Sequence, residues 1–128
     1  MFYAFKRTIE TGDQVATPWR IDMHLSAGIV HQVDVLFQDG CNHGVQVQIF
    51  QGDHQLWPSN RGATLTGNAT IISFREFHEL EPGESVLIAK MWGDGVITGK
   101  DVILNIGVLP KTILQPLSFN ELLKAITE

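Results

Sequence analysis

Apolar and polar residues alternate along the chain between Ile21 and Val108, and turns that contain glycine interrupt the alternation. Successive side chains of a β-strand point to opposite faces of the sheet, so this pattern predicts half-buried antiparallel strands. The opening segment alternates in the same way and places Tyr3, Phe5 and Ile9 on one face. The expected strands cover residues 2–9, 19–26, 29–37, 45–51, 54–57, 70–75, 86–92 and 102–108.

Eight short strands joined by loops of uneven length predict an all-β fold, an eight-stranded antiparallel sandwich of two sheets over residues 1–109. Eight is also the strand count of a jelly roll, so a single jelly roll is the favoured architecture. A closed barrel and an immunoglobulin-like sandwich stay open, because strand order cannot be read from one sequence. The strand over residues 86–92 is apolar on both of its faces, so we expect it to be buried on both.

The composition, with 44% hydrophobic and 18% charged residues, is that of a globular protein. A chain of 128 residues is the length of one domain and buries about two-thirds of its surface on folding. The core should consist of the residues in the apolar register of each strand. They are Ile21, Met23, Val33, Val35, Val47, Ile49, Ile72, Phe74, Leu87, Val102, Leu104 and Ile106.

Residues 110–128 are predicted to form a C-terminal arm, because Leu109-Pro110 ends the last strand. Ser118 and Glu121 have the spacing of a capping box, so a short helix is expected at the end of the arm. Such a short helix is marginally stable alone and needs a surface to dock on. We expect that surface to belong to a neighbouring subunit or a shell, with folding back onto the same chain as the alternative. The candidate interface residues are Ile113, Leu114, Leu117, Phe119, Leu122, Leu123 and Ile126.

The net charge is −5, and the nine basic residues are scattered along the chain. Without a basic stripe there is little to neutralise phosphates, so no nucleic-acid partner is expected. The opening MFYAFKRTIE has neither the apolar segment nor the cleavage site of a signal peptide. No apolar run approaches the roughly 20 residues that a membrane-spanning helix needs, so no membrane association is expected.

Five histidines invite a metal site, but the pair of histidines separated by one residue that marks metal-binding cupins is absent. We therefore expect surface or half-buried histidines and no metal or other cofactor. They are His24, His31, His43, His54 and His78. A spacing of two residues in a turn seldom brings a thiol and an imidazole together, so Cys41 beside His43 is expected to be a small buried turn residue.

Four glutamates cluster around a Pro-Gly turn, namely Glu76, Glu79, Glu81 and Glu84. They are expected to form a solvated rim rather than two catalytic carboxylates facing across a cleft. There is also no phosphate-binding loop and no nucleophile elbow, so an enzyme is not expected. Trp19, Trp57 and Trp92 lie at predicted strand ends and should cap the core, with a sugar-stacking platform as the alternative.

The run from Gly28 to Asn60, GIVHQVDVLFQDGCNHGVQVQIFQGDHQLWPSN, resembles small structural proteins of tailed phages and other bacterial viruses. The closing segment Ile106–Pro110 is similar to the way in which the chain leaves the barrel in such proteins. The resemblance implies a single jelly roll and a virion component bound to a capsid surface. By analogy with jelly-roll virion proteins it implies a homotrimer, and it carries over no catalytic residue.

We therefore expect a non-enzymatic virion structural protein, capsid-decorating or capsid-forming, that is made in the host cytoplasm and forms a homo-oligomer with contacts to other virion or shell proteins. Glutamines concentrate on one face of the strand over residues 45–51, and such an uncharged polar face suits contact with protein. The alternative is a carbohydrate- or receptor-binding β-sandwich module. Its candidate ligand-binding residues are Trp19, Trp57 and Arg61.

Overall fold

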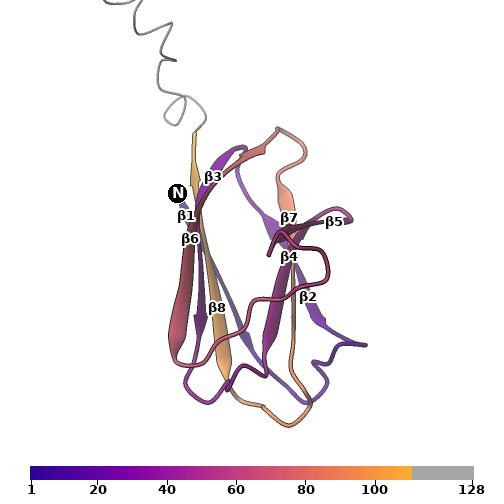
Figure 1. Cartoon of the computed structure of the whole chain (residues 1–128). Coiled ribbons are helices and arrows are strands. Elements are labelled where there is room, and N and C mark those ends of the chain that lie inside the picture. The colour runs from indigo at the N-terminus through magenta and orange to yellow at the C-terminus, as the bar shows by residue number, and fades with distance from the viewer. Residues whose placement is uncertain (111–128) are drawn as a thin grey trace, which may run out of the picture.

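Two four-stranded sheets, built only from antiparallel pairs, face each other in the computed structural model, which describes residues 1–110 (Figure 1). One sheet has the strand order β1-β8-β3-β6 and the other has the order β2-β7-β4-β5. The strands are β1 (Phe2–Thr8), β2 (Trp19–His24), β3 (Gly28–Phe37), β4 (Gln46–Gln51), β5 (His54–Trp57), β6 (Thr70–Leu80), β7 (Val86–Trp92) and β8 (Asp101–Leu109). The predicted two-sheet antiparallel sandwich is confirmed. The expected helix and interface residues of the arm lie outside the described residues.

The strands pair in a nested pattern. β1 pairs with β8, β2 with β7, β3 with β6, and β4 with β5, so the chain follows the path of one long hairpin. Successive pairs alternate between the two sheets, and the contacts β3·β8 and β4·β7 complete each sheet. The amino end of β1 consequently lies beside the carboxyl end of β8. The Met1 ammonium donates to the Val108 carbonyl at 2.7 Å, and the Val108 amide donates to the Met1 carbonyl at 2.7 Å.

The core lies between the sheets and matches the predicted apolar register. Nine of the twelve predicted core residues are fully buried: Met23, Val33, Val35, Val47, Ile49, Leu87, Val102, Leu104 and Ile106. The other three, Ile21, Ile72 and Phe74, are half-buried and pack against the core. They lie on β2 and β6, which are edge strands with one neighbour each, so side chains there are covered from fewer directions.

Two expectations about the strands were wrong. β7 is buried on its inner face at Leu87, Ala89 and Met91, but Val86 is 36% exposed and Lys90 is half-buried on the outer face. The reason is that each sheet packs against the other on one side only. β6 continues to Leu80 rather than ending at residue 75, since its side chains keep alternating between more and less exposed positions up to His78.

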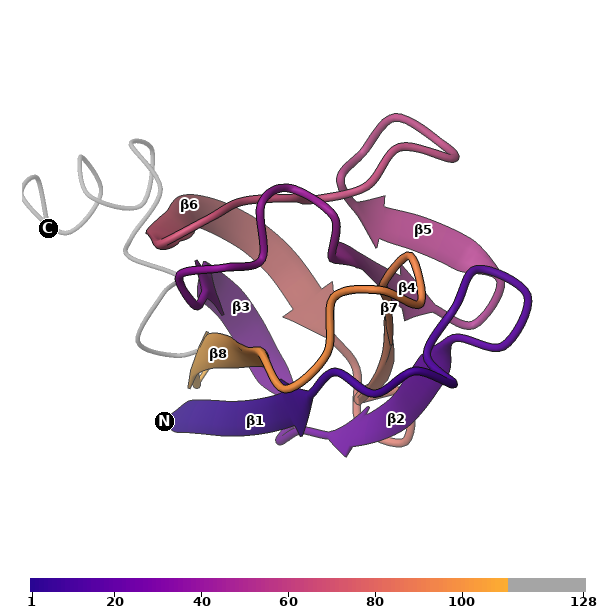
Figure 2. The same cartoon turned by 90° about the horizontal axis from the view of Figure 1, so that it is seen from below.

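Four loops meet at one end of the sandwich, which is the lower end in Figure 1 and faces the viewer in Figure 2. We call this surface the loop end, and it comprises residues 9–18, 38–45, 64–69 and 93–100. Hydrogen bonds join the loops to one another: the Ile9 amide donates to the Lys100 carbonyl at 2.9 Å, and the His43 amide donates to the Gly67 carbonyl at 3.1 Å. The Gln38 amide donates to the Asp101 carbonyl at 3.1 Å and links the two pairs of loops, so the loop end is one connected surface.

Candidate functional site

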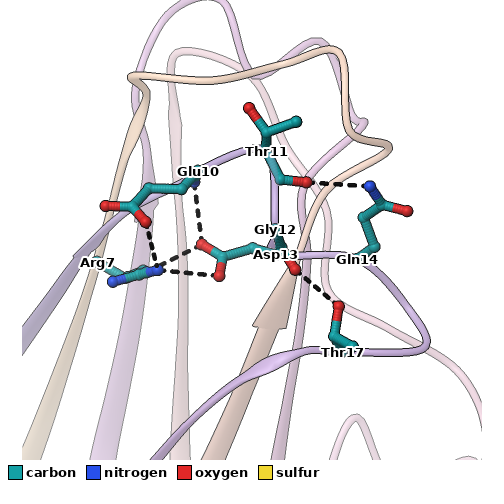
Figure 3. Close-up of polar contacts among 7 residues, drawn as sticks. All are labelled: Arg7, Glu10, Thr11, Gly12, Asp13, Gln14 and Thr17. Atoms are coloured by element: carbon teal, nitrogen blue, oxygen red, sulfur yellow. Dashed lines mark hydrogen bonds and ion pairs between the residues drawn. The ribbon is translucent and has the colours of Figure 1, made fainter.

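A charged cluster fixes the first part of the loop end (Figure 3). Arg7 occupies a core-facing position of β1, and its guanidinium donates to both carboxylate oxygens of Asp13, from Nε to Oδ2 at 2.9 Å and from Nη2 to Oδ1 at 2.9 Å. The Glu10 amide donates to Asp13 Oδ2 at 3.0 Å. The Arg7 guanidinium also lies over the Trp19 ring, 5.2 Å from its centroid. Arg7 thus ties β1, the following loop and the start of β2 together.

The Asp13 carboxyl is buried, with 6% of the residue exposed. Burial alone raises its pKa, but the hydrogen bonds from Arg7 and the Glu10 amide, together with the Arg7 charge, outweigh burial and lower it. Asp13 is therefore ionised at neutral pH. Because Arg7 occupies both of its oxygens, the carboxylate stabilises the loop and is not free for proton transfer or metal binding.

The remaining polar contacts hold the loop tips in place. The Thr17 hydroxyl donates to the Gly12 carbonyl at 2.7 Å, and the Asp13 carbonyl accepts the Gly93 amide at 2.8 Å. On the neighbouring loop, Asp94 Oδ1 accepts the amides of Val96 and Ile97, both at 2.9 Å. These two hydrogen bonds lower the pKa of Asp94. The loop end consequently presents two fixed apolar tips, Val15 with 74% and Val96 with 83% of its surface exposed.

The outer face of the β1-β8-β3-β6 sheet carries three further exposed apolar side chains. Phe2 is 67% exposed, Ile71 is 57% exposed and Phe77 is 63% exposed. In the strand register, Lys6 on β1 lies opposite Ile103, Ile103 opposite Leu36, and Leu36 opposite Ile71. The last three residues form an apolar row that crosses the sheet and ends at β6. Ile71 and Phe77 lie on β6, which is one of the two edge strands of this sheet, with β1 at the other edge (Figure 2).

A polar group lies beside this apolar row. The Asp34 carboxylate accepts hydrogen bonds from the Ser73 hydroxyl and from Gln32 Nε2, the latter at 3.1 Å. Gln32 Nε2 also donates to Ser73 Oγ at 3.1 Å. Within residues 1–110 no cation forms an ion pair with Asp34, so its negative charge is held on the outer face by neutral donors.

The glutamines of β4 and β5 form hydrogen bonds within the chain. This corrects the expectation that the glutamines of β4 form a protein-facing surface. Gln48 and Gln55 are buried, and both donate to the Ala63 carbonyl, at 2.9 and 3.0 Å. Gln55 Oε1 accepts the Gly62 amide at 3.0 Å. A buried loop backbone must find hydrogen-bond partners, and the two amides supply them for the loop after β5.

The predicted ligand-binding residues do not come together. Trp57 is 5% exposed and packs edge-on against Phe74 and His78 of β6, with ring centroids 5.9 and 5.8 Å apart. Trp19 and Trp57 belong to β2 and β5, which are opposite edges of one sheet, so the two rings do not form one stacking platform. Arg61 is exposed and lines a polar hollow of about 520 Å³ beside the β4–β5 hairpin. The other residues lining it are Gln51, Asp53, His54, Gln55 and Ser59.

Cys41 is fully buried in the loop between β3 and β4, which confirms the prediction of a buried turn residue. Burial raises the pKa of its thiol. This effect is larger than that of the hydrogen bond with the Gln38 backbone and of the Lys100 charge, which both lower the pKa. His43 is exposed, with a φ of 59°. A protonated, buried thiol is a poor nucleophile, so this pair offers no catalytic centre.

The histidines are dispersed over the fold. His31 is half-buried and packs edge-on against Phe2, and His78 Nε2 is hydrogen-bonded to Gln51 Oε1 at 2.9 Å. Among residues 1–110, no three histidine, cysteine, aspartate or glutamate side chains are grouped so that they could hold a metal ion. Glu81 and Glu84 are exposed at their turn, as expected for a rim, whereas Glu76 and Glu79 are half-buried on β6.

Sequence reasoning missed the exposed apolar side chains of the loop end and of β6. The signal was present at Val15 and Val96, which are apolar residues inside polar, glycine-containing turns. For Ile71 and Phe77 the sequence gives no comparable signal, because the apolar alternation of a strand does not say which sheet edge it occupies. The part of the chain that the structure describes contains no helix of the length and apolarity required to span a bilayer.

Comparison with models of known protein families and with curated proteins finds no match. The function is therefore inferred from the surfaces themselves, of which the outer face of the β1-β8-β3-β6 sheet carries three of the seven exposed large apolar side chains in residues 1–110.

Proposed function

We propose that this chain is a non-enzymatic virion structural protein, capsid-decorating or capsid-forming, that assembles with copies of itself and with other virion or shell proteins. The observation that carries the proposal is the outer face of the β1-β8-β3-β6 sheet, where Phe2, Ile71 and Phe77 are each more than half exposed. Large apolar side chains exposed on one face of a folded domain favour contact with another protein. Ile71 and Phe77 lie on an edge strand, where they are accessible to another chain.

The strand pairing supports a single jelly roll as the finer description of the fold. Eight strands that pair as β1·β8, β2·β7, β3·β6 and β4·β5, alternating between two sheets, have the wrapped-hairpin path that a jelly roll follows. This fold is the one that the resemblance to phage structural proteins implies. It serves many unrelated functions, so the fold alone does not carry the proposal.

The rigid loop end suits a protein that is held in a shell. Its loops are joined by backbone hydrogen bonds and by the Arg7–Asp13 pair, so little conformational entropy remains to be lost when its tips contact a partner. The apolar arm over residues 110–128 would supply a further contact, to a neighbouring subunit or to the shell. A homo-oligomer follows from the proposal, and the resemblance implies a trimer.

Co-purification with particles tests this proposal. Virus particles from cells that produce the chain are banded on a density gradient, and each fraction is blotted with an antibody to the chain. We expect the chain to band with the particles at a fixed ratio to the major shell protein. A chain found only in the soluble fractions, with particles that contain none, would contradict the proposal.

A carbohydrate- or receptor-binding module is the second candidate, and the polar hollow beside the β4–β5 hairpin favours it. Arg61, Asp53 and His54 line this hollow and are exposed donors and acceptors of the kind that bind sugar hydroxyls. A glycan array followed by titration discriminates the two functions. Saturable binding that Arg61→Ala abolishes would establish the hollow as a sugar site, and the absence of binding to any glycan would dismiss it.

A further inference from the structure

Within residues 1–110, β6 lies at one edge of its sheet. Among residues 1–110, β6 pairs with β3 alone, and it is the longest strand, from Thr70 to Leu80. An edge strand presents unpaired backbone amides and carbonyls, which are a template for pairing with another chain. We propose that β6 pairs antiparallel with β6 of a second copy, across a two-fold axis at Phe74, and so joins two sheets into one. This inference rests on the proposed function and names the surface for self-assembly.

The positions of the exposed apolar residues on β6 support a second copy as the occupant. Ile71 and Phe77 point to the same face and lie at equal distances, three residues, on either side of Phe74. In a two-fold antiparallel pair centred on Phe74, Ile71 of each copy lies opposite Phe77 of the other. The apolar row Ile103–Leu36–Ile71 then continues onto Phe77 of the second copy. In this register the contact between Ile71 of one copy and Phe77 of the other forms twice, so both exposed side chains of each copy are covered.

Charge disfavours two neighbouring registers. A two-fold axis at Arg75 places two arginines opposite each other, and an axis at Glu76 places two glutamates opposite each other, so both registers are disfavoured. With the axis at Phe74, Arg75 lies opposite Ser73 of the second copy. Ser73 is hydrogen-bonded to Asp34, whose carboxylate has no ion pair within the described chain. Arg75 of each copy is therefore brought toward the unpaired Asp34 charge of the other.

The two-fold contact is compatible with larger assemblies. An isologous contact uses the same surface on both copies and leaves the loop end and the β4–β5 hairpin available for other contacts. It would pair two chains, or join two of the trimers that the resemblance implies.

Disulfide cross-linking of single-cysteine variants tests the register. Ile71→Cys and Phe77→Cys are purified separately, mixed in equal amounts and oxidised, and the products are run on a non-reducing gel. Residues directly opposite each other have Cα atoms about 4.5–5.5 Å apart, within disulfide range, whereas identical positions 71 of the two copies would be roughly 20 Å apart. We expect a disulfide-linked dimer in the mixture and none with either variant alone.

Two controls test for cross-links through the native thiol and for cross-links formed by random collision. Cys41 is fully buried, so the wild-type chain should give no cross-link. A mixture of Ile71→Cys with Val96→Cys should also give none, because Val96 is exposed on the loop end and away from the β6 edge. Cross-linking of Ile71→Cys with itself as strongly as with Phe77→Cys would overturn the proposed register.

The remaining outcomes separate this inference from the proposed function. If the mixture does not cross-link although the chain bands with particles, the β6 contact is wrong and the proposed function stands. If in addition deleting residues 111–128 abolishes self-association, the arm rather than β6 carries the contact. If cross-linking follows the predicted pattern and the chain is absent from particles, the contact is established and the proposed function is wrong.

Discussion

Arg7 Nε and Nη2 each lie 2.9 Å from a carboxylate oxygen of Asp13, and this pair sits where the first strand enters the loop end. A charged residue on the core-facing side of a strand is accommodated because its charge is matched at once by a buried carboxylate six residues later. The pair therefore fixes the path of residues 9–18, on which the shape of the loop end depends.

Asp13→Ala should destabilise the protein by about 2–3 kcal/mol, because it leaves the partly buried Arg7 guanidinium and the Glu10 amide without their acceptor. Glu10→Gln is the matched control, since Glu10 lies 3.5 Å from Arg7 Nη2 but its side chain is 71% exposed. Its cost should stay below about 0.5 kcal/mol. Urea unfolding measures both, and equal losses for the two variants would show that the buried pair has no special weight.

The unfolded Asp13 carboxyl, near its ordinary pKa of 3.8, binds a proton before the folded one does, so stability is complete above that value and falls as pH drops through the folded pKa. The urea midpoint of the wild type should therefore fall more steeply between pH 5 and pH 2 than that of Asp13→Asn. Parallel curves for the two proteins would mean that the pair contributes nothing.

Val35→Asp and Ile49→Asp should each prevent folding. Both side chains are fully buried, and an unpaired charge there costs an amount comparable to the whole stability of about 5–15 kcal/mol. Val15→Asp is the control, because Val15 is 74% exposed on the loop end and its replacement should leave a cooperative melt unchanged in shape. A soluble, cooperatively melting Val35→Asp protein would contradict the placement of the core.

A charge introduced at Ile71 should weaken self-association, and an opposite charge at Phe77 should compensate for it. Ile71→Lys alone should weaken self-association, since it places a charge opposite the Phe77 ring of the second copy. Ile71→Lys combined with Phe77→Glu should restore it, because each lysine then faces a glutamate of the other copy. Sedimentation velocity compares the three proteins, with Val96→Lys as a surface control. A double variant as dissociated as the single one would argue against the proposed register.

Cys41 should resist thiol reagents in the folded protein. Its side chain is fully buried and burial raises the pKa of the thiol, so little thiolate is present at neutral pH. Labelling with a coloured disulfide reagent should be at least about tenfold faster in strong denaturant than in buffer, because only an exposed thiolate reacts. Rapid labelling of the native protein would place Cys41 outside the core.

The strands and most of the core were predictable because they depend on local pattern. Met23, Val35 and Leu104 follow from alternation alone, and the structure buries all three. The half-buried state of Ile72 and Phe74 was not predictable, since it depends on β6 being an edge strand, and strand order is set by long-range pairing. The outer face of β7 was misjudged for the same reason: Ile88 is apolar, but within residues 1–110 no layer covers its side of the sheet.

The candidate surfaces were less predictable than the fold. Arg7 and Asp13 look like ordinary polar residues in the sequence, and only the turn over residues 10–13 brings their side chains together. Trp57 was expected to cap the core, with ligand stacking as the alternative, and the structure packs it against Phe74 and His78. Contacts between elements decide the exposure of such residues, and one sequence does not encode them locally.

Sedimentation velocity of the full chain over a range of micromolar concentrations tests the assembly proposal most directly. The proposal predicts a species with a mass that is a multiple of the 14.2 kDa chain and that grows in proportion as the concentration rises. A single species of 14.2 kDa at every concentration, together with no binding to purified particles, would contradict it.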